Sequence, residues 1–350
     1  MKKIAVIGAG GTGVALSAIL AAKGHEVCLA DSENSAVLEG VKRAGKVCTK
    51  GTSFFEGVPV LVTEDMGEAV RRSELIVCCT ISNRDEEIAR AIAPWVDESK
   101  AVLVGAGNGA SIIYHRVFEE CGKGDVLTAE TAGNFFPARV TGDGEATTGL
   151  PLSGKGVTAF PPSRAEEAVD RFAEVWELTP CASMFEALFN GPNLICHSAG
   201  CVLNVSAMSR SGGKFNLFTD GLSEEFLNVT DALWQEKNRV YEAMEAKCSP
   251  APRGMLAGVM DPDNDAYKYF RLMDGPGDIT HRYITEDVPN LFCFFLSIAR
   301  KVGVAVPLFE GIIGLLSAAA GKDFYAEGRT LENLGWADMS KEELIALFRA

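Results

Sequence analysis

The sequence predicts an α/β chain in which a doubly wound parallel sheet comes first and an all-helical domain follows. Three observations predict this fold: strand and helix patterns alternate in the first half, a glycine-rich turn follows the first strand, and helical patterns dominate the second half. The chain has 350 residues, which is long enough for two domains with separate cores. The expected domains are residues 1–162 and 163–350.

The composition excludes several classes of partner. With 47% hydrophobic and 23% charged residues, the chain has an ordinary globular composition. Its formal net charge of −14 repels phosphate backbones and anionic membrane surfaces, so we expect small-molecule partners, with no nucleic acid and no membrane. The first residues, MKKIAVIGAG, lead into a strand pattern without the apolar region of a signal peptide, so a cytoplasmic protein is expected.

Two features could be mistaken for special sites. Residues 302–321 are apolar for about the length of a membrane span, but they contain Pro307 and Glu310, so we predict a buried helix hairpin. The ten cysteines are scattered and include no C-x-x-C spacing, which predicts reduced thiols and no metal site. Cys78 and Cys79 continue an apolar run and are predicted to belong to the core of a strand.

Apolar runs predict the strands of the first domain, at residues 4–7, 27–30, 75–79, 102–104 and 126–128. Helical patterns such as those at residues 12–24 and 85–96 separate them. This alternation is typical of a doubly wound parallel sheet.

A glycine motif follows the first predicted strand. Gly8, Gly10 and Gly13 form G-x-G-x-x-G, with Gly11 and Thr12 between them, at the start of a predicted helix. The first glycine permits a tight turn, the second lets the backbone approach a pyrophosphate, and the third allows close packing of the helix on the strand. Strand, motif and helix in this order predict a Rossmann dinucleotide site, in which helix N–H groups face the phosphates. The alternative is a glycine-rich turn that binds nothing.

The residue that ends the second strand indicates which dinucleotide binds. Asp31 is placed to accept a hydrogen bond from a ribose 2′-hydroxyl and would repel a 2′-phosphate. No arginine follows it in residues 31–36, so NAD (as NADH) is favoured over NADP, and FAD is less favoured still. Thr80 follows a later strand, where such a sheet presents loops to the nicotinamide. Residues 105-GAGNG-109 do the same after the next strand, unless they form a simple connection.

The second domain is predicted from helical patterns at residues 164–177, 192–209, 222–246, 289–303 and 340–348. The boundary is expected at 160-FPPSR-164, where two prolines precede a helix.

Two places in this second domain hold residues suited to catalysis. His197 lies in an apolar helix, where a neutral ring needs a partner; the alternative is a core histidine bonded to a backbone carbonyl. The stretch 281-HRYITEDVPN-290 gathers several charged side chains. Its Asp287 has an alternative role as the cap of the helix that Pro289 begins.

Together with the glycine motif, 190-NGPNLICH-197, 282-RYITEDVP-289 and 328-GRTLENLG-335 resemble the octopine/nopaline, or opine, dehydrogenases. The resemblance spans nearly the whole chain. It implies that His197 pairs with Asp287 of an R-Y-x-T-E-D-x-P motif whose arginine is Arg282. Residues 130–139 also resemble the family, whereas Gln235-Glu236-Lys237 departs from the acidic-Glu-Arg pattern expected there.

The resemblance implies an NADH-dependent condensation of an amino acid with a 2-oxo acid such as pyruvate, and these two are then the expected partners. His197 would be the acid/base, because an imidazole with an ordinary pKa of about 6.5 suits proton transfer near neutrality. Asp287 would orient it, and Arg282 would bind a substrate carboxylate. The alternative for Arg282 is an ion pair with Glu286 or Asp287 that only braces the loop. Tyr283 and His281 are expected to pack or to line the rim, and a homodimer is the assembly to test.

Three other functions stay open. The first is a different dehydrogenase that also consists of a Rossmann domain followed by a helical domain but acts on a hydroxy acid, such as a relative of ketopantoate reductase. That class uses a lysine with an asparagine one helical turn later, and no lysine of this chain has an asparagine four residues on. The second is a module that binds NAD without turnover. The third is a hydrolase or transferase that uses a cysteine, for which the sequence offers no nucleophile and base at a recognisable spacing.

Overall fold

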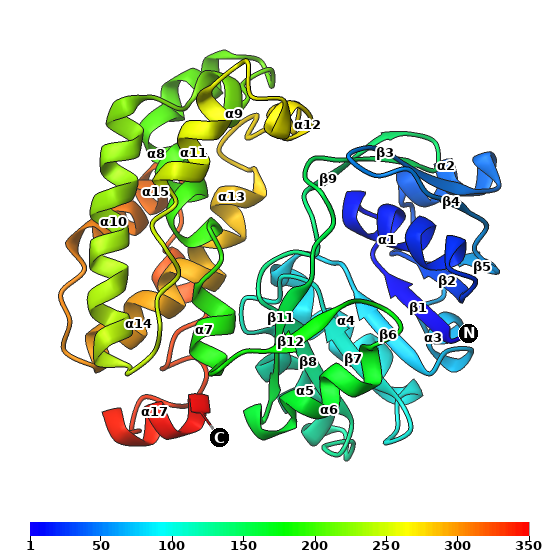
Figure 1. Ribbon diagram of the computed structural model, residues 1–350. Helices are drawn as coiled ribbons and strands as arrows, with labels where there is room; N and C mark the ends of the chain where they lie inside the picture. The colour runs from blue at the N-terminus through cyan, green and yellow to red at the C-terminus, as the bar shows by residue number, and fades with distance from the viewer. Residues whose placement is uncertain (350) are drawn as a thin grey trace. The chain divides into compact units, whose positions relative to one another are not determined.

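The computed structural model describes residues 1–349, which form two compact units divided between Cys181 and Ala182 (Figure 1). The N-terminal unit is built on parallel β-structure, and the C-terminal unit is helical. The predicted fold class is therefore confirmed. The division lies later in the chain than the predicted boundary after residue 162.

The N-terminal unit is organised around a sheet with the strand order β12-β11-β8-β7-β6-β1-β2-β5. All neighbouring strands in it are parallel except β11 and β8. Its strands are β1 (Lys3–Ile7), β2 (Glu26–Ala30), β5 (Leu61–Thr63), β6 (Leu75–Cys78), β7 (Ala101–Val104), β8 (Leu127–Thr131), β11 (Lys155–Phe160) and β12 (Leu178–Pro180).

Helices cover both faces of this sheet, because alternate side chains of each strand point to opposite sides. On β1, Ile4 and Val6 join one hydrophobic cluster, and Ala5 and Ile7 join another. The first cluster is completed by α1 (Gly11–Ala22), α2 (Ala36–Ala44) and α6 (Ala165–Phe172), and the second by α3 (Met66–Arg71), α4 (Asp85–Ile92) and α5 (Ala110–Glu120). The sheet is thus doubly wound, as predicted.

A second, four-stranded sheet was not predicted. Its order is β4-β3-β10-β9, and its strands are β3 (Val47–Gly51), β4 (Glu56–Gly57), β9 (Ala138–Gly142) and β10 (Glu145–Thr148). These strands are short and carry threonine, glycine and charged residues, so a search for apolar runs misses them. Helix α1 packs against strands of both sheets, which explains why residues 13–20 are all buried (Figure 1).

The predicted boundary is corrected by α6 and β12, which both belong to the N-terminal unit. Ala168 and Phe172 of α6 lie in the core beneath the main sheet, and β12 extends that sheet beside β11. An amphipathic helical pattern does not reveal whether the helix covers a sheet or another helix. The pattern at residues 164–177 therefore predicts a helix but does not determine the domain to which that helix belongs.

The C-terminal unit is built around the long helices α8 (Asn193–Arg210) and α10 (Glu224–Ala243), which run side by side (Figure 1). Helices α13 (Arg282–Thr285) and α15 (Pro307–Ala320) pack against α8. The remaining helices are α7 (Met184–Phe189), α9 (Leu217–Asp220), α11 (Arg253–Met260), α12 (Lys268–Arg271), α14 (Cys293–Lys301), α16 (Phe324–Glu327) and α17 (Lys341–Arg349).

Residues 302–321 do not form a hairpin of their own, so that prediction was wrong. They contain a turn and the single helix α15, whose first residue is Pro307; the hairpin is made by α14 and α15 together. Proline suits the first turn of a helix because its missing N–H has no intrahelical acceptor there. Across residues 1–349, the helices are too short or too polar to cross a bilayer.

Candidate active site

The glycine turn after β1 has the shape that a pyrophosphate requires. Gly8 has a φ of +102°, a conformation that favours glycine. Gly10 precedes α1 and has no side chain to cap the first N–H groups of the helix, and a Cβ added there would meet nothing within 4 Å. At Gly13 a Cβ would lie 1.8 Å from the carbonyl oxygen of Gly8. The turn therefore offers an open, uncapped helix N-terminus, which fits a dinucleotide phosphate.

The two residues between these glycines face β9 and the loop before it. A Cβ on Gly11 would lie 2.6 Å from the carbonyl oxygen of Ala138, so this glycine permits close packing of α1 on β9. The Thr12 hydroxyl and the Asn134 amide are hydrogen bonded, with Nδ2 to Oγ1 at 3.0 Å. Asn134 was not singled out from the sequence, although it lies in the stretch 130–139 that resembled the family.

Asp31 lies at the end of β2 beside the glycine turn. Its Oδ2 accepts hydrogen bonds from Ala9 N at 3.2 Å and Ser35 Oγ at 2.9 Å, and its Oδ1 accepts one from Ser32 N at 2.8 Å. A carboxylate has about four acceptor positions, so one further hydroxyl can be accommodated. Three donors thus hold the Asp31 carboxylate next to the turn.

Two further loops adjoin the turn. A Cβ on Gly8 would lie 3.1 Å from Cγ2 of Thr80, so the loop after β6 borders the glycine turn. Asn108, in the loop after β7, donates to Ser82 Oγ at 3.2 Å and joins the two loops. The structure therefore brings Thr80 to the same edge of the sheet as the glycine motif and Asp31.

Glu130 anchors the loop after β7 and was missed by sequence reasoning. This residue of β8 is 1% exposed and accepts hydrogen bonds from Gly109 N at 2.8 Å, Ser111 N at 3.1 Å and Ser111 Oγ at 2.6 Å. The signal in the sequence is a glutamate near the end of an otherwise uncharged strand. Buried carboxylates need such donors, so Glu130 fixes the course of residues 105–111.

Gly13→Ala and Gly10→Ala should separate packing from phosphate binding. We expect Gly13→Ala to lower the Tm by about 5 °C or more, because the added methyl group collides with the Gly8 backbone. Gly10→Ala should leave the Tm nearly unchanged but weaken NADH binding, because the methyl group enters the open space at the helix N-terminus. Thermal melts and NADH titrations of both variants test this. An unchanged Tm for Gly13→Ala would contradict it.

In the C-terminal unit, His197 of α8 is hydrogen bonded to Asp287. Its Nδ1 lies 2.8 Å from Asp287 Oδ2, and the two residues are 9% and 1% exposed. Asp287 directly precedes a π-helical turn, Val288–Phe292, that continues into α14. The alternative in which Asp287 caps this helix is wrong, because its side chain makes no capping hydrogen bond and turns to His197 instead.

Helix α13 places Arg282 and Tyr283 beside this pair. The Tyr283 ring stacks on the His197 ring, with centroids 3.6 Å apart and planes 18° apart. The guanidinium carbon of Arg282 lies 5.2 Å from the centroid of the Tyr283 ring. The side chain of Arg282 is 37% exposed, and its Nη1 lies 3.5 Å from Oε2 of the buried Glu286. The ion pair foreseen as the alternative for Arg282 therefore exists, and its partner is Glu286.

The cysteines are free thiols, and burial makes the deepest of them poor nucleophiles. Burial raises the pKa of Cys78, Cys196 and Cys293 to about 12 and raises that of Cys79 further. The thiolate is the nucleophile, so these positions do not support a cysteine-dependent hydrolase or transferase. Within residues 1–349, no group of three or more His, Cys, Asp or Glu side chains is arranged to hold a metal ion.

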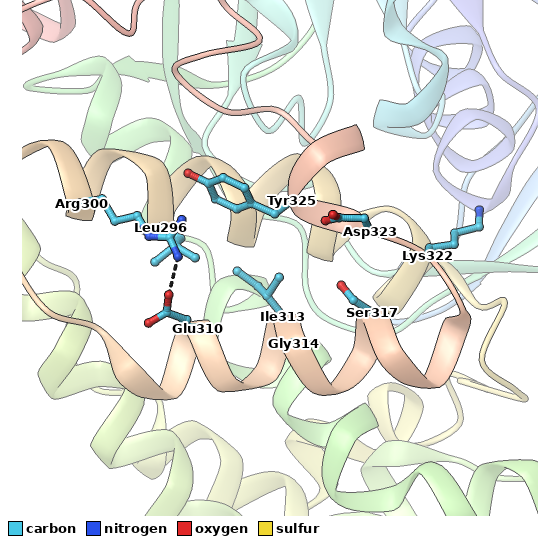
Figure 2. Close-up of a pocket in the computed structure, with 9 residues that line it drawn as sticks. All are labelled: Leu296, Arg300, Glu310, Ile313, Gly314, Ser317, Lys322, Asp323 and Tyr325. Atoms are coloured by element: carbon cyan, nitrogen blue, oxygen red, sulfur yellow. Dashed lines mark hydrogen bonds and ion pairs between the residues drawn. The ribbon is translucent and has the colours of Figure 1, made fainter.

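A pocket of about 420 Å³ lies between α14, α15 and the turn that follows (Figure 2). Arg300 and Glu310 form an ion pair at one end of it, and Ile313 and Leu296 supply apolar walls. None of the residues predicted for chemistry lines this pocket. It is therefore distinct from the His197–Asp287 pair.

Two family models match different parts of the chain. The model of the α-helical domain of NAD/NADP octopine/nopaline dehydrogenases matches residues 180–320. This segment contains His197, Asp287 and Arg282. The model of the ketopantoate reductases PanE/ApbA matches residues 4–147, which contain the glycine motif and Asp31.

Two similar proteins and one similar solved structure are dehydrogenases. An opine dehydrogenase of Arthrobacter sp. (strain 1C) is 24% identical over 353 residues, covering 97% of this chain and 96% of that protein. A glycerol-3-phosphate dehydrogenase [NAD(P)+] of Geobacter sp. (strain M21) is 34% identical over 335 residues, covering 90% of this chain and 92% of that protein. A solved octopine dehydrogenase with NADH and L-arginine has the same fold, with a TM-score of 0.70 at 16% identity over 99% of this chain and 98% of that one.

Proposed function

Because this chain belongs to the octopine/nopaline, or opine, dehydrogenase family of NAD(P)-dependent oxidoreductases, we propose that it joins an amino acid to a 2-oxo acid and reduces the product with NADH. The observation that carries the proposal is the buried hydrogen bond between His197 and Asp287, beside an arginine that is partly exposed. The product is an N-(carboxyalkyl) amino acid, and the reaction is reversible.

His197 is the proton shuttle of this reaction. Its Nδ1 points to Asp287, so Nε2 is the nitrogen that exchanges protons with the substrates. When the neutral amine adds to the 2-oxo carbon, Nε2 takes a proton from the nitrogen and gives it to the carbonyl oxygen, which becomes a hydroxyl. A second proton, taken up from solvent and delivered by the same Nε2, lets this hydroxyl leave as water and leaves a protonated imine. Asp287 holds the ring in one tautomer and stabilises the imidazolium. NADH supplies the hydride for the final reduction when it is bound.

Arg282 binds a carboxylate of the substrates. Its fork of N–H groups matches a carboxylate in two parallel hydrogen bonds, which a lysine does not reproduce. At 3.5 Å its contact with Glu286 is longer than a normal hydrogen bond, so donors of the guanidinium are left for a ligand.

The matched amino acid and 2-oxo acid are identified by a substrate matrix. Each amino acid is combined with pyruvate, 2-oxoglutarate or glyoxylate, and NADH consumption is followed by absorbance. The mass of the product is then measured by mass spectrometry. A product whose mass is that of both substrates joined, with loss of water and gain of two hydrogens, supports the proposal. NADH consumption with a 2-oxo acid alone, with no amine incorporated, would contradict it.

The Asp31 carboxylate should make the enzyme favour NADH over NADPH, because a 2′-phosphate would meet a negative charge. We expect Asp31→Ser to narrow the ratio of the two dissociation constants about tenfold. Ser35→Ala is the matched control: it removes a donor to Asp31 but keeps the carboxylate, so the ratio should stay as it is. If the unmodified enzyme binds NADPH tenfold more tightly than NADH, the role given to Asp31 is wrong.

Glycerol-3-phosphate oxidation is a second candidate function, favoured by the relative that is 34% identical over 90% of the chain. Lys237 of α10 is the residue to examine for it. This lysine is 1% exposed, burial lowers its pKa to about 8, and it donates to Ser249 Oγ at 3.2 Å. Reduction of NAD⁺ or NADP⁺ with glycerol-3-phosphate, abolished by Lys237→Met, would favour this function over opine synthesis.

A further inference from the structure

We infer that Tyr283 is the positioning residue for His197, whose imidazole plane it fixes and whose protonated form it favours. The catalytic part of this inference rests on the proposed function. The part that concerns the geometry and the titration of His197 does not depend on the identity of the substrate.

The hydrogen bond to Asp287 alone does not fix the orientation of the His197 ring. Hydrogen bonds tolerate a range of angles, so the imidazole plane can still swing while Nδ1 stays within reach of Oδ2. The Tyr283 ring lies against the face of the imidazole, with centroids 3.6 Å apart and planes 18° apart, and therefore blocks this swing. The hydrogen bond to Asp287 in the ring plane and the contact with Tyr283 on the ring face together determine where Nε2 points.

Tyr283 is itself firmly held. It is 2% exposed, and its carbonyl oxygen accepts a hydrogen bond from Ser198 Oγ at 3.0 Å. Ser198 follows His197 in α8, so one helix carries both the imidazole and the anchor for the ring that stacks on it. At the start of α13, Nδ1 of His281 accepts from Tyr283 N at 3.3 Å. The Tyr283 backbone is thus held at both its N–H group and its carbonyl oxygen.

The same ring connects His197 to Arg282. The face of an aromatic ring is electronegative and attracts cations, and the guanidinium carbon of Arg282 lies 5.2 Å from the Tyr283 centroid. A protonated imidazole gains from the same attraction, whereas a neutral one gains little. Tyr283 therefore favours the form of His197 that acts as the acid.

The effects of the other charged groups on the protonation of His197 partly cancel. Asp287 stabilises the imidazolium directly, whereas Arg282 and Glu286 form an ion pair with no net charge. Helix α8 and the elements packed against it carry further titratable groups, among them Cys196 and Cys201 on α8, Glu236 and Lys237 on α10, Glu310 on α15, His281, Arg282 and Tyr283 at α13, and Glu286 and Asp287 before α14. Variants of Tyr283 leave all the other groups in place.

The test compares Tyr283→Phe with Tyr283→Leu in the full chain. Phenylalanine keeps the aromatic face, and leucine keeps the apolar volume without it. NMR of the protein with labelled histidines reports the titration of His197. We expect the titration midpoint of His197 to be lower by roughly half a pH unit in Tyr283→Leu than in Tyr283→Phe. The sign follows because loss of a contact that favours the cation lowers the pKa.

Turnover is the second readout. Tyr283→Leu should lower kcat on the order of tenfold, through misorientation of Nε2, with little change in NADH binding. Tyr283→Phe should recover most of that loss. Tyr241→Leu is the matched control: Tyr241 is 1% exposed, and its ring packs on Phe185, whereas the ring that stacks on His197 is that of Tyr283. This variant should lose stability but leave the His197 midpoint in place.

The outcomes separate the two proposals. Equal His197 midpoints in the Phe and Leu variants, with equal turnover, would make Tyr283 a packing residue and overturn the inference. A shifted midpoint in a protein that joins no amine to any 2-oxo acid would support the positioning role and contradict the proposed function.

Discussion

His197→Ala and Asp287→Asn should each lower turnover by a factor on the order of 10² or more, and the double variant should be little worse than His197→Ala. The two side chains act as one unit through the 2.8 Å hydrogen bond between Nδ1 and Oδ2, so their removals should not add. Steady-state kinetics of the three variants, with the substrate pair found in the matrix, measure this directly.

Asp287→Asn is the informative member of the set. Asparagine keeps the size of the aspartate but loses the negative charge that stabilises an imidazolium, and its amide can select the wrong tautomer of His197. NADH binding should survive, because the glycine motif and Asp31 lie in the N-terminal unit.

Cys293→Ala provides a control for simple loss of packing. Cys293 is fully buried at the start of α14 and donates to the carbonyl oxygen of Phe324. Its replacement should cost stability without changing turnover. If Asp287→Asn instead keeps full turnover and only lowers the Tm, then Asp287 stabilises the fold and the catalytic role proposed for it is wrong.

Arg282→Lys should raise the KM for the carboxylate substrate on the order of tenfold or more, with nearly the same Tm and NADH affinity. Lysine keeps the charge and loses the paired N–H donors. The Arg282 side chain is 37% exposed, so an ion pair made by it contributes little to stability. Substrate saturation curves and thermal melts measure the two effects separately.

Glu286→Gln is the matched control for Arg282→Lys, because it removes the ion pair from the other side. If Arg282 binds a substrate carboxylate, this variant should change the KM for that substrate far less than Arg282→Lys does. If Arg282 braces the segment, both variants should lose similar stability and retain similar KM values. That second pattern would support the structural role of the Arg282–Glu286 pair.

Local patterns in the sequence determined the nucleotide-binding half. Gly8 and Gly10 lie in the turn after β1, Gly13 lies in the first turn of α1, and Asp31 directly follows the neighbouring strand β2. Short-range geometry therefore places all four at the same edge of the sheet. The alternation of apolar runs with helical patterns gave the doubly wound sheet for the same reason. Strand and helix periods are local properties that a sequence displays directly.

The helical half depended on tertiary structure. The sequence alone left His197 as a core histidine or an acid/base, and Asp287 as a cap or its partner, and only the family resemblance paired them. The two are 90 positions apart, and their meeting depends on how α13 packs on α8. The stacking of Tyr283, the extra sheet of short polar strands and the late division at Cys181 were likewise decided by packing. Contacts between distant segments have no period in the sequence, because they are set by the shapes of the surfaces that fold together.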